Sequence, residues 1–376
     1  MVKVFYWSPF ISKIATSKAV INSAISLEKY SKNTIKPYLI SLFNEWEHHS
    51  DVIIQNKLKL INLFKIKLNI KLPDQGFLLS RLSFIFIFFI SFFPLLRILK
   101  KEKPDFIIIH LNTSLPLVLL FFFNFKTKFI LRISGKVRLN FIRKFLWRSV
   151  SKKLYKITTP TQLSANELVE KNIFPSSKID TLYDPILNID RLKKKIKISE
   201  NKNLIAIGRL TKQKNFKFLI NCFNILCKKH GDFTLDIFGD GDQKKELEKL
   251  IIEKNLEKKV FLRGYKQNID EYIRDAHCFV LTSLWEDPGF VLIEAAINNT
   301  LILSSNCETG PKEILQNMKN SFVFESNNSE SFYKAFENLI KTNDETKFKM
   351  RVSMKKSLKK FTIFNHFNSL KKILDF

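Results

Sequence analysis

The second half of the chain alternates short apolar runs with amphipathic stretches. Runs such as "NLIAIGRL" and "HCFVLTS" have the length of strands, whereas "NFKFLINCFNILCKKHG" and "QKKELEKLIIEKN" place apolar residues at helical spacing. Short, continuously apolar strands that alternate with helices are typical of a parallel sheet covered on both faces. Ligands of such sheets bind outside the carboxyl ends of the strands, and the turn glycines of this half fall there.

The first half repeats the pattern less regularly. Strands are predicted at "VKVFYWS", "KPYLISLF", "PDFIIIHLN" and "TKFILRISG", with helical stretches between them, and the charged segment 190–203 is the expected linker. We therefore expect an α/β protein with two Rossmann-like domains, at 1–190 and 191–358, whose parallel sheets face a central cleft. Residues 359–376 are expected to form a C-terminal helix.

The most apolar segment, residues 82–96, lies between Arg81 and Arg97 and contains Pro94. It is shorter than the ~20 residues that span a bilayer, so a transmembrane helix is disfavoured. A second run, "LPLVLLFFFNF", ends before Lys126. Two interpretations remain open, buried helices or helices in shallow contact with an anionic membrane surface.

Charge and cysteine content narrow the class of protein. The chain carries 63 Lys and Arg against 35 Asp and Glu, a formal net charge of +28. Such a surface attracts phosphates of nucleic acid, anionic lipid or a phosphorylated metabolite, although an AT-rich genome would also enrich lysine. Aromatic residues do not interleave with the cations, which argues against nucleic acid. Four cysteines without a CxxC pair, and an N-terminus that resembles a strand, predict a cytoplasmic protein without a metal site.

A candidate phosphate site follows the strand "NLIAIG". Gly208 permits a sharp turn, and Arg209 and Lys214 come just before the next helix. Free amides at a helix N-terminus and two cations all favour an anion, although both cations could also be solvated loop residues.

The turn "FGDGDQ" has two interpretations. Asp240 and Asp242 form a D-x-D pattern that can hold a divalent metal against a diphosphate. The same residues make an ordinary strand-to-helix turn in which Asp242 caps the helix, and their position favours this second interpretation.

The segment "WEDPGFVLIEAA", residues 285–296, places Glu286 and Glu294 on either side of a Pro288–Gly289 break, with a helix beginning at Phe290. Two carboxylates at one site are compatible with acid–base hydrolysis or with binding of sugar and ribose hydroxyls. Taken alone, the segment does not decide between them.

Together these segments resemble the donor domain of the retaining glycosyltransferases of family four, which have the GT-B fold. The resemblance covers about 110 residues continuously, from "GRLTKQKN" through "FGDGD" and "WEDPGFVLIEAA" to "GPKEIL". It implies that Glu286 faces hydroxyls of the donor sugar, that Glu294 holds the nucleotide ribose, and that Arg209 and Lys214 neutralise the diphosphate.

The resemblance also implies roles for residues around these groups. Gly264 and Tyr265 would line the base pocket, and His110 would lie near the donor sugar. The remaining donor-binding positions that it implies are Gly208, Pro288, Gly289, Phe290 and Val291. The C-terminal helix would cross back onto the first domain. Two departures stand out: the loop "SPFISKIATSKAV" contains no glycine, and Asp287–Pro288 replaces a common Gly-Phe pair.

The expected function is transfer of a sugar from a UDP- or GDP-sugar to a hydroxyl of a growing lipid-linked or cell-surface glycan, such as a lipopolysaccharide, with retention of configuration. No metal or other cofactor is expected. The expected location is the cytoplasm or, peripherally, the inner face of the cytoplasmic membrane. Two alternatives are a GT-B epimerase or phosphorylase, the latter without a recognisable pyridoxal-phosphate lysine, and a non-catalytic basic membrane or nucleic-acid-binding protein.

Overall fold

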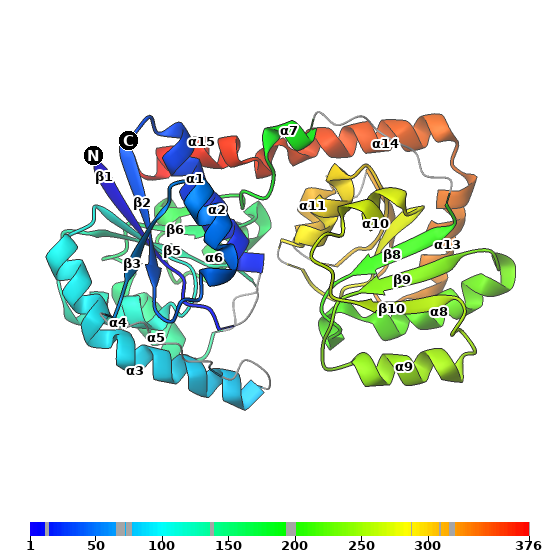
Figure 1. Cartoon of the computed structure of the whole chain (residues 1–376), viewed down its shortest axis with the longest axis horizontal. Helices are drawn as coiled ribbons and strands as arrows, with labels where there is room; N and C mark the ends of the chain where they lie inside the picture. The colour runs from blue at the N-terminus through cyan, green and yellow to red at the C-terminus, as the bar shows by residue number, and fades with distance from the viewer. Residues whose placement is uncertain are drawn as a thin grey trace. The chain divides into compact units, whose positions relative to one another are not determined.

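The computed structural model describes residues 1–11, 15–64, 72, 77–135, 139–192, 201–286, 288–307, 310–315 and 320–375. Two compact units divide the chain, residues 1–188 with 361–376 and residues 189–360 (Figure 1). Residues 193–200, which form most of the predicted linker, lie outside the described residues. The C-terminal segment thus belongs to the first unit.

The first unit contains a seven-stranded parallel sheet with the strand order β3-β2-β1-β4-β5-β6-β7. Its strands are β1 (Val2–Trp7), β2 (Ile35–Ser41), β3 (Lys59–Asn62), β4 (Phe106–Ile109), β5 (Lys128–Arg132), β6 (Lys156–Thr159) and β7 (Ile179–Thr181). Its helices are α1 (Ala15–Tyr30), α2 (Ser50–Gln55), α3 (Phe77–Glu102), α4 (Ser114–Phe122), α5 (Phe141–Val150), α6 (Gln162–Glu170) and α15 (Ile363–Ile373).

The second unit contains a six-stranded parallel sheet with the order β10-β9-β8-β11-β12-β13. Its strands are β8 (Asn203–Ile207), β9 (Thr234–Phe238), β10 (Val260–Gly264), β11 (Cys278–Leu281), β12 (Leu301–Ser305) and β13 (Phe322–Phe324). Its helices are α7 (Ile189–Leu192), α8 (Phe216–Lys229), α9 (Lys244–Glu253), α10 (Asp270–Asp275), α11 (Phe290–Ile297), α12 (Gly310–Ile314), α13 (Ser329–Lys341) and α14 (Asp344–Ser357).

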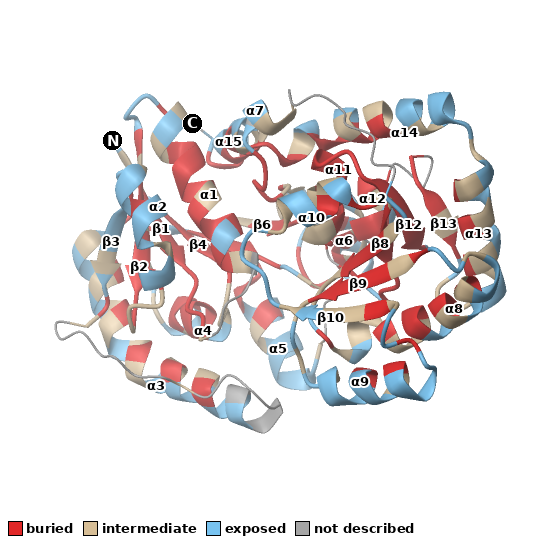
Figure 2. Cartoon of the chain, turned by 45° about the vertical axis from the view of Figure 1, so that its right-hand side comes forward, coloured by how far each residue is buried: buried red, intermediate tan, exposed pale blue. Residues whose placement is uncertain are grey.

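The predicted pair of Rossmann-like α/β domains is confirmed. The central strands β4, β11 and β12 are buried along their whole length, as Figure 2 shows for β4 and β12. Burial on both faces explains why β4 and β11 are continuously apolar and do not alternate. In each sheet the strand order reverses beside the first strand, between β1 and β4 and between β8 and β11. Crevices for ligands form at such reversal points, at the carboxyl ends of the strands.

Helix α15 packs on α1 within the first unit. The ring centroids of Tyr30 and Phe364 are 5.2 Å apart, and Phe367 and Leu370 are buried in one core cluster with Val20. This packing explains why the last residues of the chain belong with the first strands.

Helix α3 is longer than the apolar run 82–96 suggested. It extends over Phe77–Glu102, with Pro94 inside, and it is the one helix of the described residues that is long and apolar enough to cross a membrane. The sequence argument that this segment is too short to span was therefore wrong. The error arose because Arg97, Lys100 and Lys101 continue the helix beyond the apolar run.

Candidate functional site

The reversal point of the second sheet carries the predicted phosphate site. The loop after β8 begins at Gly208, and the loop after the neighbouring β11 leads to Glu286. Since the two strands are adjacent and parallel, both loops leave the sheet at the same edge. Residues 70 or more positions apart in the sequence are thereby brought into contact.

Glycines let the loops at this edge approach through their backbones. A Cβ on Gly239 would lie 1.9 Å from the carbonyl oxygen of Gly208, and a Cβ on Gly241 would lie 2.5 Å from that of Leu210. The amide of Gly239 also donates to the carbonyl of Gly264, at 2.9 Å. Backbones this close exclude any side chain, so the ends of β8, β9 and β10 form one glycine-lined edge.

Lys214 and Glu286 form a nearly buried ion pair at this edge. Their side chains are 11% and 7% exposed, and the ammonium contacts Oε1 of the carboxylate. The hydroxyl of Ser283 donates to the same oxygen at 2.6 Å. A Cβ on Gly208 would lie 2.6 Å from Cε of Lys214, so the lysine side chain crosses directly over the glycine.

Hydrogen bonds fix the two loops to each other. Thr282 donates from Oγ1 to the carbonyl of Lys214 at 2.8 Å, and the amide of Leu284 donates to the carbonyl of Gln213 at 2.8 Å. The Gln213 side chain donates to the carbonyl of Trp285 at 2.8 Å. The position of Lys214 is therefore set by the loop after β11 as well as by its own.

Helix α11 begins at the same edge. Gly289 precedes it in the left-handed conformation, with φ 87°, and the amide of Leu292 donates to the Gly289 carbonyl. A Cβ on Gly310 would lie 1.8 Å from the carbonyl oxygen of Pro288, so the segment "GPKEIL" packs on the Pro–Gly break. Glu294 is half-buried on this helix among buried apolar neighbours.

The remaining predicted positions are spread along the edge. Arg209 is exposed, and no ion pair to it is formed among the residues the structure describes. Tyr265 is 69% exposed just beyond β10, and Phe290 and Val291 are half-buried in the first turn of α11. Gly208, Lys214, Glu286 and Gly289 are thus brought together, whereas Tyr265 lies three strands from β11.

The predicted helix cap at Asp242 is wrong. Helix α9 has Gln243 at its N-cap position, without a side-chain capping bond, and Asp242 is exposed. Asp240 instead accepts a hydrogen bond from the amide of Gly241 at 2.9 Å. Contact between Gly241 and Leu210 holds the turn in place, so the helix starts one residue later than the acid would require.

In the first unit, His110 lies at the reversal point between β1 and β4. Its amide donates to the carbonyl of Trp7 at 2.9 Å, and its ring stacks on Tyr6 with centroids 6.0 Å apart. Burial lowers the pKa of His110 well below its ordinary value, and the nearby Arg132 and His366 add to this effect. The imidazole is therefore neutral at physiological pH.

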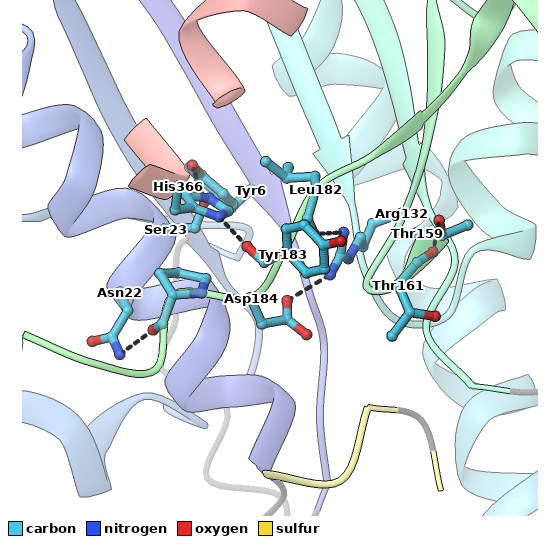
Figure 3. Close-up of polar contacts among 11 residues, drawn as sticks. Tyr6, Asn22, Ser23, Arg132, Thr159, Thr161, Leu182, Tyr183, Asp184 and His366 are labelled. Atoms are coloured by element: carbon cyan, nitrogen blue, oxygen red, sulfur yellow. Dashed lines mark hydrogen bonds and ion pairs between the residues drawn. The ribbon is translucent and has the colours of Figure 1, made fainter. Parts of the chain in front are cut away.

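Tyr6, on which the His110 ring stacks, begins a chain of buried hydrogen bonds that no sequence pattern predicted (Figure 3). Tyr6 and Ser23 are hydrogen-bonded at 2.9 Å, Ser23 contacts Nε2 of His366 at 2.8 Å, and Nδ1 of His366 contacts the carbonyl of Tyr183 at 2.7 Å. Burial lowers the pKa of His366 to about 3. A neutral ring whose Nδ1 donates to the carbonyl must accept at Nε2, so Ser23 donates to His366 and Tyr6 donates to Ser23.

Arg132 and Asp184 extend the same region. Arg132 donates from one nitrogen to Asp184 at 2.6 Å and from another to the carbonyl of Leu182 at 2.5 Å, and both side chains are buried (Figure 3). Arg132 is the last residue of the apolar strand β5, in "FILRISG", and this position in the sequence indicated a charge at the edge of the sheet. His366 gave no such signal, because its partners come from distant parts of the chain.

The two parallel α/β sheets, the second with a glycine-lined edge that carries the Lys214–Glu286 ion pair, place the protein in the class of two-domain Rossmann-like α/β proteins. Residues 188–361 match the family model described as glycosyl transferases group 1. The second unit therefore belongs to this family, and the resemblance predicted from the sequence is confirmed.

Individual relatives agree with this assignment. An uncharacterized glycosyltransferase of Methanocaldococcus jannaschii is 32% identical over 59% of this chain and 61% of its own length, so the chain spans less than two thirds of that relative. The Escherichia coli UDP-Gal:alpha-D-GlcNAc-diphosphoundecaprenol alpha-1,3-galactosyltransferase is 24% identical over 75% of this chain and 76% of its own length.

The similarity in three dimensions covers the whole chain. The crystal structure of a Staphylococcus aureus TarM variant in complex with fondaparinux, alpha-GlcNAc-glycerol and UDP matches with a TM-score of 0.77, at 14% identity, over 100% of both chains. At this identity the match shows the fold alone, and it confirms the GT-B fold.

Proposed function

We propose that the protein is a glycosyltransferase that moves a sugar from a nucleoside-diphosphate sugar, a UDP- or GDP-sugar, to a hydroxyl of a lipid-linked or cell-surface glycan. The proposal extends to retention of the anomeric configuration and to catalysis without a metal. UDP is favoured as the nucleotide, since the TarM variant was crystallised with UDP and the Escherichia coli relative is named for UDP-Gal.

The Lys214–Glu286 pair at the reversal point of the second sheet carries the proposal. A nearly buried ammonium beside a glycine-lined edge can be neutralised by a diphosphate as well as by Glu286. A bound donor would therefore compete for Lys214. Glu286 would then be released to accept hydrogen bonds from sugar hydroxyls, while Ser283 keeps it in place.

Other groups at the edge complete the donor site in this proposal. Arg209, which is exposed, would reach the outer phosphate oxygens, and the first amides of α11, at Phe290 and Val291, point out of a helix N-terminus. Glu294 would accept from the ribose hydroxyls. Gly264 and Tyr265 would face the base, and Tyr265 is exposed enough to stack on it.

The reaction follows from this distribution of charge. The bond between the anomeric carbon and the β-phosphate oxygen breaks, and its electron pair leaves with the diphosphate, whose charge Arg209, Lys214 and the helix amides stabilise. The acceptor oxygen forms the new bond on the same face of the sugar, and its proton passes to the departing phosphate. In this scheme the carboxylate of Glu286 does not attack the sugar.

His110 has a separate role in the proposal. A neutral, buried imidazole whose Nε2 has no hydrogen-bond partner among the described residues can donate to or accept from a sugar hydroxyl. It would orient the reacting sugar or acceptor without changing its charge.

The direct test is transfer from a panel of UDP- and GDP-sugars to an undecaprenyl-diphosphate-linked saccharide, with the anomeric configuration of the product read by NMR. An α-linked product from an α-linked donor, formed equally with and without EDTA, is expected. An inverted product would contradict retention, and loss of activity in EDTA would contradict metal independence. If none of the nucleotide-sugars in the panel reacts, the transferase assignment is contradicted.

A further inference from the structure

Helix α3 buries a narrow stripe against the first sheet. The buried positions recur every fourth residue, at Ser83, Ile87, Ser91, Leu95 and Leu99. Ile87, Leu95 and Leu99 belong to the same core cluster as the strand residues Ile107 and Phe129. One face of α3 thus covers the sheet, which leaves the opposite face to the surroundings.

The outward face of α3 is apolar over several turns. Its exposed residues include Leu82 (55%), Ile85 (52%), Phe86 (41%), Phe89 (69%) and Phe93 (75%). The outward face of a helix on a soluble protein is ordinarily polar, so a row of exposed phenylalanines indicates an interaction surface. Figure 2 shows the exposed and buried positions alternating along the helix.

Helices α4 and α5 add to this surface. Phe122 at the end of α4 is 67% exposed, and Phe141, Ile142 and Phe145 on α5 are 86%, 75% and 59% exposed. The rings of Phe121 and Phe145 join the two helices, with centroids 6.4 Å apart, and α4 also contacts α3. We call these exposed apolar residues of α3, α4 and α5 the apolar face.

Cations accompany the apolar face almost without acids. Exposed cations on α3 and α5 are Arg81, Arg97, Lys100, Lys101, Arg143, Lys144 and Arg148. In the sequences of α3, α4 and α5 the single acidic residue is Glu102, at the last position of α3. A surface that combines exposed phenylalanines with surrounding positive charge matches the boundary between acyl chains and anionic headgroups.

We propose that the apolar face docks on the surface of an anionic lipid bilayer and inserts its phenylalanine side chains shallowly, without spanning it. A spanning α3 would have to leave the sheet and expose the strands that Ile87, Leu95 and Leu99 cover. A second copy of the chain fits less well, because the same face on the partner would bring like charges together. The cytoplasmic leaflet supplies both the apolar interior and the negative charge.

The position of the apolar face matters for access to substrate. The Asn112 side chain, just beyond the carboxyl end of β4, donates to the carbonyl of Phe84 at 3.4 Å, and the Asn112 carbonyl accepts from Trp7. The N-terminal half of α3 therefore adjoins the carboxyl edge of the first sheet, beside His110. A lipid-linked acceptor held in the docked membrane would be presented at that edge.

Co-sedimentation of the full chain with vesicles tests the docking. We expect binding to vesicles of phosphatidylcholine with about 30% phosphatidylglycerol, and much weaker binding to phosphatidylcholine alone. The double variant Phe89→Ser/Phe93→Ser should bind the anionic vesicles at least about tenfold more weakly. Equal binding of the variant and the wild type, or equal binding to both kinds of vesicle, would overturn the proposal.

Matched controls separate docking from folding and from catalysis. Ile252→Ser removes an exposed apolar residue (61%) of α9 in the second unit and should leave vesicle binding unchanged. Both variants should keep the thermal shift on addition of UDP, so a defect in docking is distinguishable from failure of the proposed transferase function.

Two other results would assign the apolar face differently. If the wild type is a dimer in lipid-free solution that does not bind vesicles, and Phe89→Ser/Phe93→Ser converts it to a monomer, the face binds a second copy of the chain. Resistance to alkaline carbonate extraction would indicate a spanning helix, and either result would overturn the proposal.

Discussion

The two sheets have the same strand order at their reversal points, yet the chemistry at the two carboxyl edges differs. The second sheet presents a glycine-lined edge with Lys214, Glu286 and the exposed Arg209. The first sheet has aromatic side chains at its edge, where the neutral ring of His110 stacks on Tyr6. Its buried charged residues, Arg132 and Asp184, form an ion pair with each other. The same topology can therefore support two different chemistries. Under the proposed function, the second edge would hold the diphosphate, and the first would hold a reacting group without adding charge.

Backbone proximity explains much of the difference. At the second edge, Gly239 and Gly241 allow the loops to touch through their backbones, and Gly208 allows the Lys214 side chain to cross directly over it. In the first unit, the loop after β1 contains no glycine. The side-chain polar groups of Tyr6, Ser23 and His366 are hydrogen-bonded to one another in the interior. Substitutions at the first edge are therefore expected to change mainly the stability of the fold. Substitutions of charged residues at the second edge are expected to change mainly the binding of the donor.

The largest effect is expected from Lys214→Met. Removing the ammonium leaves the carboxylate of Glu286 nearly buried and uncompensated, which should lower the free energy of unfolding by about 3–5 kcal/mol. Adding Glu286→Gln should restore most of the loss, because the amide is neutral and still accepts from Ser283. Thermal melts of both variants measure this. A double variant as unstable as the single one would show that the pair is not a stabilising unit.

The second-largest effect is expected from acid, which should destabilise the fold at the first edge. His110 and His366 have folded-state pKa values below the ordinary 6.5, so their stabilisation is complete above pH 6.5 and is lost as the pH falls toward the folded values. Each contributes up to about 1.4 kcal/mol per pH unit below 6.5. His366→Asn should flatten the decline in melting temperature between pH 6.5 and 5, and His48→Asn, at an exposed position, should not. An unchanged pH profile for His366→Asn would contradict the neutral hydrogen-bonded chain.

Arg209→Ala should affect the second edge without affecting its stability. The side chain is exposed, so the melting temperature should stay the same, while loss of a charged contact to the diphosphate should weaken UDP binding about 10- to 100-fold. Lys212→Ala removes an exposed cation three positions away and is the matched control. Calorimetric titration with UDP measures the affinity of each variant. Similar weakening in both would show that any nearby positive charge has the same effect, which would contradict a specific contact of Arg209 with the diphosphate.

Gly208→Ala should have the smallest effect of the four. The new methyl group would press on the flexible Lys214 side chain, which can shift while it stays paired with Glu286. We expect a loss of about 1 kcal/mol in stability and a severalfold loss of donor binding. Gly231→Ala, whose methyl group would lie 3.3 Å from a carbonyl oxygen, should leave donor binding unchanged. Wild-type UDP binding by Gly208→Ala would show that the path of the Lys214 side chain over Gly208 does not matter for donor binding, which would contradict this prediction.

The sequence predicted the second unit in more detail than the first. Short strands between amphipathic helices defined its sheet, and the resemblance carried by the segments from "GRLTKQKN" to "GPKEIL" implied its candidate site. The extent of α3 was missed, because its cationic last turns do not look like part of an apolar helix. The Asp242 cap was wrong because a backbone contact, which no local pattern reveals, sets the start of α9.

The Lys214–Glu286 pairing and the His366 chain were also beyond reach of the sequence. Each residue type was visible, but the pairing depends on which loops meet at an edge. For His366 the partners, Ser23 and Tyr183, come from α1 and from the loop after β7. Such contacts are products of the tertiary fold, and the roles proposed for the site residues remain predictions.

Binding of UDP and GDP to the wild type and to the Lys214→Met/Glu286→Gln variant tests whether the second edge is the donor site. Both proteins are expected to fold, so a shift in melting temperature on adding nucleotide reports the second edge alone. We expect a clear shift for the wild type with at least one nucleotide, and little or none for the double variant. Equal shifts in the two proteins would contradict a donor site built on Lys214 and Glu286.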